Sequence, residues 1–278
     1  MIKSILLPVD GSIFTDSQVK HGIHLAKSFD ATVKILSVVD IRIIEWAAAM
    51  GTDGFVPVTP STIYKEESKK ILEAKSEAVL EKCSGIFKKA GIKFEIEKLH
   101  GSPADVICEK MHVVDLVVMG LRGEFAKWRH KLVGATLYAV VREWEKPILV
   151  TKQHFKKFTS ILFAYDGSHK ANKALQLAGY WAAALNVPLT VLSVHVKEKL
   201  RNKVLNEAKV YLEPYGINLD LIGAAGNPEK EIGRYCEQKK CNLIIMGAFG
   251  HSRIREAILG STTEQVMRNS KIPVLLSK

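Results

Sequence analysis

The chain of 278 residues contains no long hydrophobic run and few cysteines. No apolar stretch approaches the roughly 20 residues that a membrane-spanning helix needs, so we expect no membrane contact. The N-terminal sequence reaches Pro8 and Asp10 too early for a signal peptide, which indicates a cytoplasmic protein. The four cysteines lack the paired spacing of zinc ligands, so they are expected to be reduced, mostly structural thiols. They are Cys83, Cys108, Cys236 and Cys241.

Two common nucleotide-binding motifs and the usual catalytic patterns are also missing. The Walker pattern, Gly-Lys followed by Ser or Thr, does not occur, and no Gly-x-Gly-x-x-Gly follows the first apolar strand. There is no Ser-His-Asp order and no pair of carboxylates in a glycine turn, and histidines such as His21 and His195 lie in amphipathic or apolar patterns. An enzyme is therefore the weaker hypothesis.

The composition is that of a soluble globular protein, with 47% hydrophobic and 25% charged residues. The net charge is +11, and it is uneven. Residues 1–152 carry 22 Lys and Arg against 19 Asp and Glu, whereas residues 153–278 carry 18 against 10. Lysines alternate with glutamates in segments such as KEESKKILEAKSEAVLEK, which indicates a solvated helix face. A small anionic ligand is therefore favoured over a nucleic acid.

The two halves of the chain repeat one pattern. Ser4–Ser12 returns as Ser160–Ser168 at an offset of 156 residues, and Pro147–Val150 returns as Pro273–Leu276 at an offset of 126. The offset decreases once and then holds, so the first half contains an insertion of about 30 residues. The chain is therefore predicted to be a tandem repeat of one fold.

The two units are expected at residues 1–152 and 156–278, with a basic linker, KQHFKKF, between them. The insertion in the first unit is the long connection at 40–65, whose glycines and prolines interrupt any regular pattern. A connection of this length is usually a lid or a packing arm. The corresponding connection in the second unit is only KEKLRN.

Strands alternate with helices in each unit. An apolar strand at Lys3–Val9, a helix at 15–28 and a strand at Thr32–Val39 predict a parallel sheet. Ser102 is predicted to cap a helix that begins at Pro103. Further predicted elements are a helix at about Tyr64–Ala90 and strands at Lys93–Lys98, Leu116–Met119 and Ile272–Leu276.

A glycine-rich stretch follows the apolar run Leu243–Met246. Gly247 and Gly250 bracket a turn, and nine residues separate Gly250 from Gly260, which Ser261 follows. Glycines let backbone N–H groups approach an anion, and a helix N-terminus supplies unpaired N–H donors. The stretch is therefore a candidate phosphate cradle, although a glycine pair after a strand can also be only a tight turn.

The spacing Gly-x2-Gly-x9-Gly-Ser after an apolar strand resembles the nucleotide-binding loop of the universal stress protein family. The resemblance covers nearly the whole chain. It implies an α/β fold with two tandem doubly wound domains, each a five-stranded parallel sheet of order 3-2-1-4-5 flanked by helices. It also implies that residues 148–150 pair with residues 274–276 across an internal pseudo-dimer, and a homodimer is a further expectation. The ligand would lie outside the carboxyl ends of the first and fourth strands.

The resemblance further implies the site residues of the second unit. Asp166 would lie near the adenine or ribose, and Ala164 and Val194 would contact the adenine. The loop residues implied near the phosphates are Met246, Gly247, Gly250, Arg253, Gly260, Ser261 and Thr262. Asp166 could instead be a helix N-cap, and His251 is better explained as a solvated loop residue.

The corresponding loop of the first unit departs from the family pattern. Ten residues rather than nine separate Gly123 from Gly134, and Ala135 replaces the serine. The loop adds basic residues, namely Arg122, Lys127, Arg129, His130 and Lys131. The implied site residues here are Pro8, Asp10, Val38, Gly120, Gly123, Gly134 and Thr136. This loop would hold an anion differently or not at all.

These observations predict a stress-response protein that binds an adenine nucleotide, ATP or AMP, mainly in its C-terminal unit. Two alternatives remain open. A cradle holding Mg2+ near Asp166 would need only a positioned water for slow ATP hydrolysis. A pseudo-dimeric scaffold with degenerate sites would instead act through protein partners.

Overall fold

The computed structural model describes residues 1–40, 42, 62–124, 133–143, 146–248 and 259–278. The connection at 40–65 therefore lies largely outside the described residues, as do parts of both glycine loops. The loop residues that lie outside the described part of the chain include Lys127, Arg129, His130, Lys131, Gly250, His251 and Arg253.

Strands and helices alternate through the first half of the chain, as the hydrophobic pattern predicts. Short apolar runs form the buried strands, and the β-branched segment TVKILSVV forms the longest of them. The elements are β1 (Ser4–Pro8), α1 (Thr15–Phe29), β2 (Thr32–Val39), α3 (Thr62–Ala90), β3 (Phe94–His100), α4 (Pro103–Met111), β4 (Leu116–Gly120), α5 (Ala135–Glu143) and β5 (Ile148–Thr151).

The second half repeats this order with a shorter helix in the position of α3. The elements are β6 (Ile161–Ala164), α6 (His169–Leu185), β7 (Leu189–Val194), α7 (Glu198–Leu212), a 3-10 turn at Glu213–Tyr215, β8 (Leu219–Ala224), α8 (Pro228–Gln238), β9 (Leu243–Gly247), α9 (Ser261–Asn269) and β10 (Val274–Ser277).

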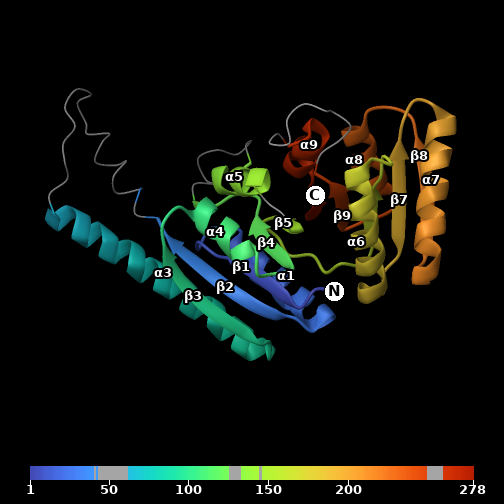
Figure 1. The fold of residues 1–278 in the computed structure, drawn as a ribbon. Helices are drawn as coiled ribbons and strands as arrows, with labels where there is room; N and C mark the ends of the chain where they lie inside the picture. Colours follow the sequence, from blue (N-terminus) through green and yellow to red (C-terminus); the bar gives the residue numbers. More distant parts are fainter. Residues whose placement is uncertain (41, 43–61, 125–132, 144–145, 249–258) are drawn as a thin grey trace, which may run out of the picture.

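All the strands join one ten-stranded sheet of order β3-β2-β1-β4-β5-β10-β9-β6-β7-β8. Figure 1 shows β3 and β8 toward opposite ends of the molecule. Each half has the predicted order 3-2-1-4-5 with parallel neighbours. The halves meet where β5 and β10 run antiparallel, with Val150 opposite Val274, Leu149 opposite Leu275 and Ile148 opposite Leu276. The predicted pairing across an internal pseudo-dimer is therefore confirmed.

The sheet lies between two helical layers, and each layer has a hydrophobic core that runs through both halves. Alternate strand residues face opposite layers, as Leu149 and Ile148 of β5 do. One core joins α1, α3, α6 and α7 to the sheet, and the other joins α4, α5, α8 and α9. Among the described residues, no helix combines the length and apolar character that crossing a membrane would require.

The starts of α4 and α6 decide two expectations about helix caps. Helix α4 begins at Pro103 with Ser102 at its N-cap position, as predicted, although the Ser102 side chain makes no capping hydrogen bond. Asp166 is not the N-cap of α6, because Ser168 occupies that position and its Oγ accepts from the Ala171 N–H at 3.2 Å. Asp166 instead accepts a hydrogen bond from the Ser168 N–H at 3.0 Å, which closes an Asx turn before the helix.

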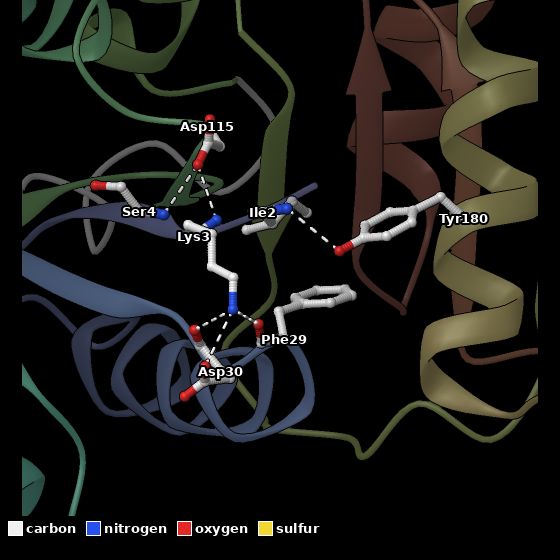
Figure 2. Close-up of polar contacts among 7 residues, drawn as sticks. All are labelled: Ile2, Lys3, Ser4, Phe29, Asp30, Asp115 and Tyr180. Carbon is white, nitrogen blue, oxygen red and sulfur yellow. Dashed lines mark hydrogen bonds and ion pairs between the residues drawn. The ribbon is translucent and has the colours of Figure 1, made fainter.

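The start of the chain also connects the two halves. In Figure 2, the Ile2 N–H donates to the Tyr180 hydroxyl of α6 at 3.2 Å. The Tyr180 ring stacks on Phe29 of α1 with a centroid distance of 5.6 Å. Asp115 Oδ2 accepts from the backbone N–H groups of Lys3 and Ser4 at 2.8 and 3.0 Å, which fastens the start of β1 beside β4.

Candidate functional site

A cavity opens at the carboxyl ends of the first and fourth strands in each half. In a doubly wound sheet the strand order reverses at this point, so the loops diverge and leave a crevice. The cavity of the first half, beside β1 and β4, has a volume of about 860 Å³. The cavity of the second half, beside β6 and β9, has a volume of about 290 Å³. We call them the first and second cavities.

The second cavity brings together eight of the ten residues predicted for this unit. They are Ala164, Asp166, Val194, Met246, Gly247, Gly260, Ser261 and Thr262. The other two, Gly250 and Arg253, lie outside the described residues. Residues far apart in the sequence therefore meet on one wall, because β6 and β9 are neighbours and Ala164 pairs with Met246. Further residues that the sequence did not predict also line this cavity, among them Ser168, Pro228, Ile232 and Thr263.

The N-terminus of α9 forms the polar side of the second cavity. Gly260 occupies the N-cap position, and no side-chain hydrogen bond caps this helix within the described chain. The Gly260 N–H donates to the Ala248 carbonyl at 3.1 Å, and the Thr263 hydroxyl donates to the Gly247 carbonyl at 3.2 Å. These contacts hold the start of α9 against the end of β9. The first N–H groups of a helix carry a partial positive charge, so this wall suits an anion.

The Asp-Gly-Ser turn after β6 forms another part of the second cavity. Gly167 has a φ of +74°, a left-handed conformation that favours glycine. A β-carbon at this position would lie 2.9 Å from Cγ2 of Val204 on α7. Glycine is therefore needed both for the turn and for the close approach of α7, and the turn places Asp166 on the cavity wall.

All seven residues predicted for the first unit line the first cavity. They are Pro8, Asp10, Val38, Gly120, Gly123, Gly134 and Thr136. Asp10 Oδ1 accepts hydrogen bonds from the Ser12 N–H at 2.9 Å and the Thr15 hydroxyl at 3.3 Å. A β-carbon on Gly123 would lie 2.7 Å from Asp10 Oδ2, so the glycine lets the loop reach this carboxylate. The longer loop thus keeps its glycines against the cavity.

Helix α3 adds a wall to the first cavity that was not predicted from the sequence. Leu72, Lys75, Ser76 and Val79 line it from this helix. Their spacing of three and four residues marks one helix face, a signal that the sequence did contain. The Ser76 hydroxyl donates to Ser37 Oγ of β2 at 2.8 Å, and Lys75 forms an ion pair with Glu124.

Helix α9 also contacts the first half of the molecule. Glu264 lines the first cavity although it belongs to the second half. Near the other end of α9, the Lys152 ammonium group donates to the Met267 carbonyl. Burial and, to a smaller extent, the nearby positive charge of Arg122 lower the pKa of Lys152 to about 7. One helix therefore contributes Ser261 to the second cavity and Glu264 to the first.

The described parts of both cavities lack a cluster typical of a protein-bound metal. Among the described residues, no group of three or more His, Cys, Asp or Glu side chains could hold a metal ion. The polar groups that line the cavities are backbone groups, hydroxyls and separate charged side chains.

Comparison with known proteins agrees with the fold. The sequence profile of the Universal stress protein family matches residues 1–152 and 195–278. The universal stress protein Slr1230 of Synechocystis sp. is 33% identical over 285 residues, which span 99% of this chain and 99% of that protein. A Mycolicibacterium smegmatis universal stress protein is 22% identical over 291 residues, covering 98% of this chain and 96% of that protein.

A solved structure shows the same fold over the whole length of the chain. The crystal structure of a universal stress protein from Archaeoglobus fulgidus DSM 4304 has a TM-score of 0.78 at 23% identity, and the match covers 99% of this chain and 98% of that one. The match to the family profile in both halves, together with the full-length relative, identifies the family. The chain belongs to the universal stress protein family.

Proposed function

We propose that the chain binds an adenine nucleotide and holds it mainly in the second cavity. One observation carries the proposal, namely that Ala164, Asp166 and Val194 line the same cavity as the end of β9 and the start of α9. Residues that resemble an adenosine site thus lie beside the N-terminus of α9, which no described side chain caps and which favours phosphate.

Each part of the second cavity has a chemical role in this proposal. Ala164 and Val194, at the ends of β6 and β7, contact the adenine ring. Asp166 accepts a hydrogen bond from the ribose or the adenine. Ser261 and Thr262 donate from their hydroxyls and backbone N–H groups to the phosphates, where Gly247 and Gly260 leave room for the approach. The ligand is ATP or AMP, and Mg2+ accompanies ATP.

The first cavity supports a second candidate, in which the first half also binds a nucleotide. Its volume of about 860 Å³ falls within the typical range for small-molecule sites, about 300–1,000 Å³, whereas the second cavity is at the lower end. It also combines Asp10 with the first glycine loop and adds Arg122 as a positive charge. A chain with two competent sites would bind two nucleotides.

Native mass spectrometry with ATP or AMP tests both candidates. The variant Gly260→Val/Ser261→Ala changes the second cavity. Gly134→Val changes the first, because its β-carbon would lie 3.0 Å from the Arg122 Cα. Gly233→Val is the matched control, because a β-carbon on this glycine of α8 meets nothing within 4 Å.

The number of bound nucleotides distinguishes the outcomes. One nucleotide per chain, lost in Gly260→Val/Ser261→Ala and kept in Gly134→Val and in the control, supports the second cavity. Two per chain, each lost with one variant, supports both cavities. No binding by the folded wild-type chain contradicts the proposal and favours the scaffold. Phosphate released from ATP by the wild type, but not by the variant that has lost binding, would add slow hydrolysis to the function.

A further inference from the structure

The turn between α8 and β9 brings two of the four cysteines together at the end of the sheet away from the cavities. The Cys241 N–H donates to the Cys236 carbonyl at 2.9 Å, and the Lys240 N–H donates to the Glu237 carbonyl at 3.1 Å. Lys240 has a φ of +51°, in the left-handed region. These two hydrogen bonds and this conformation define a Schellman motif, which brings the side chains of its first and sixth residues into contact.

Both contacting residues of this motif are cysteines. Each is buried, with 7% of its surface exposed, and the two thiols lie within hydrogen-bonding reach of each other. The Ser160 hydroxyl donates to Cys241 Sγ at 3.5 Å. A disulfide requires β-carbons about 4 Å apart. Two cysteines whose thiols meet across one helix-terminating turn are placed for such a bond between the end of α8 and the start of β9.

The first half of the chain carries apolar residues at the same place. Pro103, Ile107 and Met111 follow one face of α4 as Pro228, Ile232 and Cys236 follow one face of α8. Val114, just before β4, takes the position of Cys241 just before β9. An apolar contact between Met111 and Val114 would thus serve for packing alone. The fold does not require thiols at these positions.

The environments of the cysteines also differ. The hydrogen bond from Cys236 lowers the pKa of Cys241, and Ser160 and the Lys239 ammonium group act in the same direction. Burial raises the pKa of Cys83 and of Cys108 to about 11. Since the thiolate is the nucleophile, this difference favours Cys241 over Cys83 and Cys108 as the attacking thiol.

We propose that Cys236 and Cys241 form a dithiol site that a hydroperoxide oxidises to an intrachain disulfide. The Cys241 thiolate attacks one peroxide oxygen, the O–O bond breaks, and the leaving oxygen takes up a proton to become water when hydrogen peroxide is the oxidant. The Cys236 thiol then attacks the sulfur of the resulting sulfenic acid and loses its proton, and a second water leaves. Two thiols and one peroxide thus give one disulfide and two waters.

Peptide mapping tests this site directly on the full-length protein. The reduced protein, freed of reductant, is treated with hydrogen peroxide, alkylated with N-ethylmaleimide in denaturant and digested with trypsin. Cleavage after Lys239 and Lys240 separates the two cysteines, so a disulfide appears as peptide 235–239 linked to peptide 241–253. We expect this linked pair at peroxide doses at which Cys83 and Cys108 remain alkylated, and we expect a reductant to separate it.

Two variants complete the test. Cys83→Ser/Cys108→Ser should form the linked pair as the wild type does, because neither residue belongs to the site. In Cys236→Ser the disulfide cannot form, so Cys241 should accumulate as a sulfenic acid that dimedone traps. The proposal is overturned if Cys236 and Cys241 remain alkylated at doses that oxidise Cys83 or Cys108. It is equally overturned if either residue is found linked to a different cysteine.

Discussion

The two halves of this chain share a strand order, yet their cavities differ about threefold in volume, about 860 against 290 Å³. In each half one helix, α3 or α7, packs over the Asp-Gly-Ser turn; we call these two the covering helices. Both make the same contact with the glycine of that turn. Gly11 and Gly167 each have a φ of +74°, and a β-carbon on either would lie within 3 Å of a valine methyl group, on Val79 of α3 or Val204 of α7. The two helices therefore occupy equivalent places at this point.

The helices differ in length and in the side chains they present beyond that contact. Helix α3 has 29 residues and α7 has 15. Three residues before the shared valine, α3 carries Ser76 and α7 carries Arg201. The Arg201 guanidinium donates to the His195 carbonyl at 2.8 Å and lies over the end of β7, and no described residue of α7 lines the second cavity. The covering helix thus lines the larger cavity in the first half, whereas its described counterpart in the second half does not line the smaller one.

The largest effect is expected at Trp181, which marks a difference between α6 and α1. Trp181 is fully buried and packs against Phe29 of α1, with a centroid distance of 5.3 Å, and against Phe158 of the linker. Its counterpart in α1, at the offset of 156, is Leu25. Trp181→Ala should lower the free energy of unfolding by about 4 kcal/mol, because it removes a large side chain from a packed core. Urea denaturation followed by circular dichroism would measure this loss.

Two controls separate packing from polarity at this position. The Trp181 indole N–H is buried without a hydrogen-bond partner among the described residues, so Trp181→Phe should cost much less than Trp181→Ala. Leu25→Ala removes fewer atoms and should cost about 3 kcal/mol. An equal loss for Trp181→Phe and Trp181→Ala would show that ring packing does not explain the effect.

The next largest effect is a pH dependence of stability that α1 causes and α6 does not. Burial lowers the pKa of His21 in α1 to about 4, from an ordinary value of 6.5, and its counterpart in α6 is Leu177. Above pH 6.5 the imidazole is neutral in both the folded and the unfolded state. As the pH falls from 6.5 to 4, only the unfolded state takes up the proton readily, so stability decreases by up to about 3 kcal/mol.

Replacing the histidine with the residue of the second half tests this difference. The His21 ring contacts Phe155 and Phe158 at centroid distances of 4.7 and 5.4 Å, so protonation opposes packing of the linker on α1. His21→Leu should flatten the pH dependence of stability between pH 6.5 and 4, measured by urea denaturation at each pH. Carboxylates also titrate near the lower limit, so the informative quantity is the difference between variant and wild type. Identical pH profiles would exclude His21 as the source.

A smaller effect is expected when the covering helices exchange one residue. Ser76→Arg should place an arginine in the first cavity, at the position that Arg201 has in α7. Arg201→Ser is the reciprocal change in the second half. Under the second candidate function, in which the first cavity also binds a nucleotide, Ser76→Arg in the Gly260→Val/Ser261→Ala background should weaken that binding by at least about tenfold, or about 1.4 kcal/mol. Titration with a fluorescent ATP analogue would measure it. If binding is measurable in that background and Ser76→Arg leaves the affinity unchanged, the residue at position 76 of α3 does not limit the space for the nucleotide.

The sequence was sufficient for the features that depend on local patterns. The resemblance to a family implied the strand order and the pairing of β5 with β10. The structure confirms both and shows that this pairing is antiparallel. Glycine spacing also identified residues that line the cavities, since a glycine turn after a buried strand must lie at the carboxyl edge of the sheet.

Other features depend on tertiary placement, which spacing does not encode. Glu264 lines the first cavity only because the β5–β10 pairing brings α9 beside the other half. Ser102 carries a capping residue type but makes no capping hydrogen bond. Cys236 and Cys241 meet because Lys240 adopts a left-handed conformation, which a lysine in the sequence does not signal.

The smallest effect concerns Asp115 and Asn242, which accept hydrogen bonds from backbone N–H groups at or just before the first strand of each half. Asp115 accepts hydrogen bonds from two backbone N–H groups at the start of β1, as Figure 2 shows. Asn242, at the equivalent place, accepts from the Thr159 N–H at 2.9 Å and the Ser160 N–H at 3.3 Å. Asn242 additionally donates to the Lys157 carbonyl at 2.6 Å, and this donor exists only on an amide.

Exchanging the two residue types therefore has unequal expected effects. Asn242→Asp removes the amide donor and leaves a carboxylate oxygen facing the Lys157 carbonyl, so it should lower the free energy of unfolding by about 1 kcal/mol. Asp115→Asn keeps an acceptor for both N–H groups of β1 and should cost less. Urea denaturation at pH 7, where a carboxylate is charged, compares the two variants. A larger loss for Asp115→Asn would mean that the charge of Asp115, rather than its acceptor geometry, fastens the first strand.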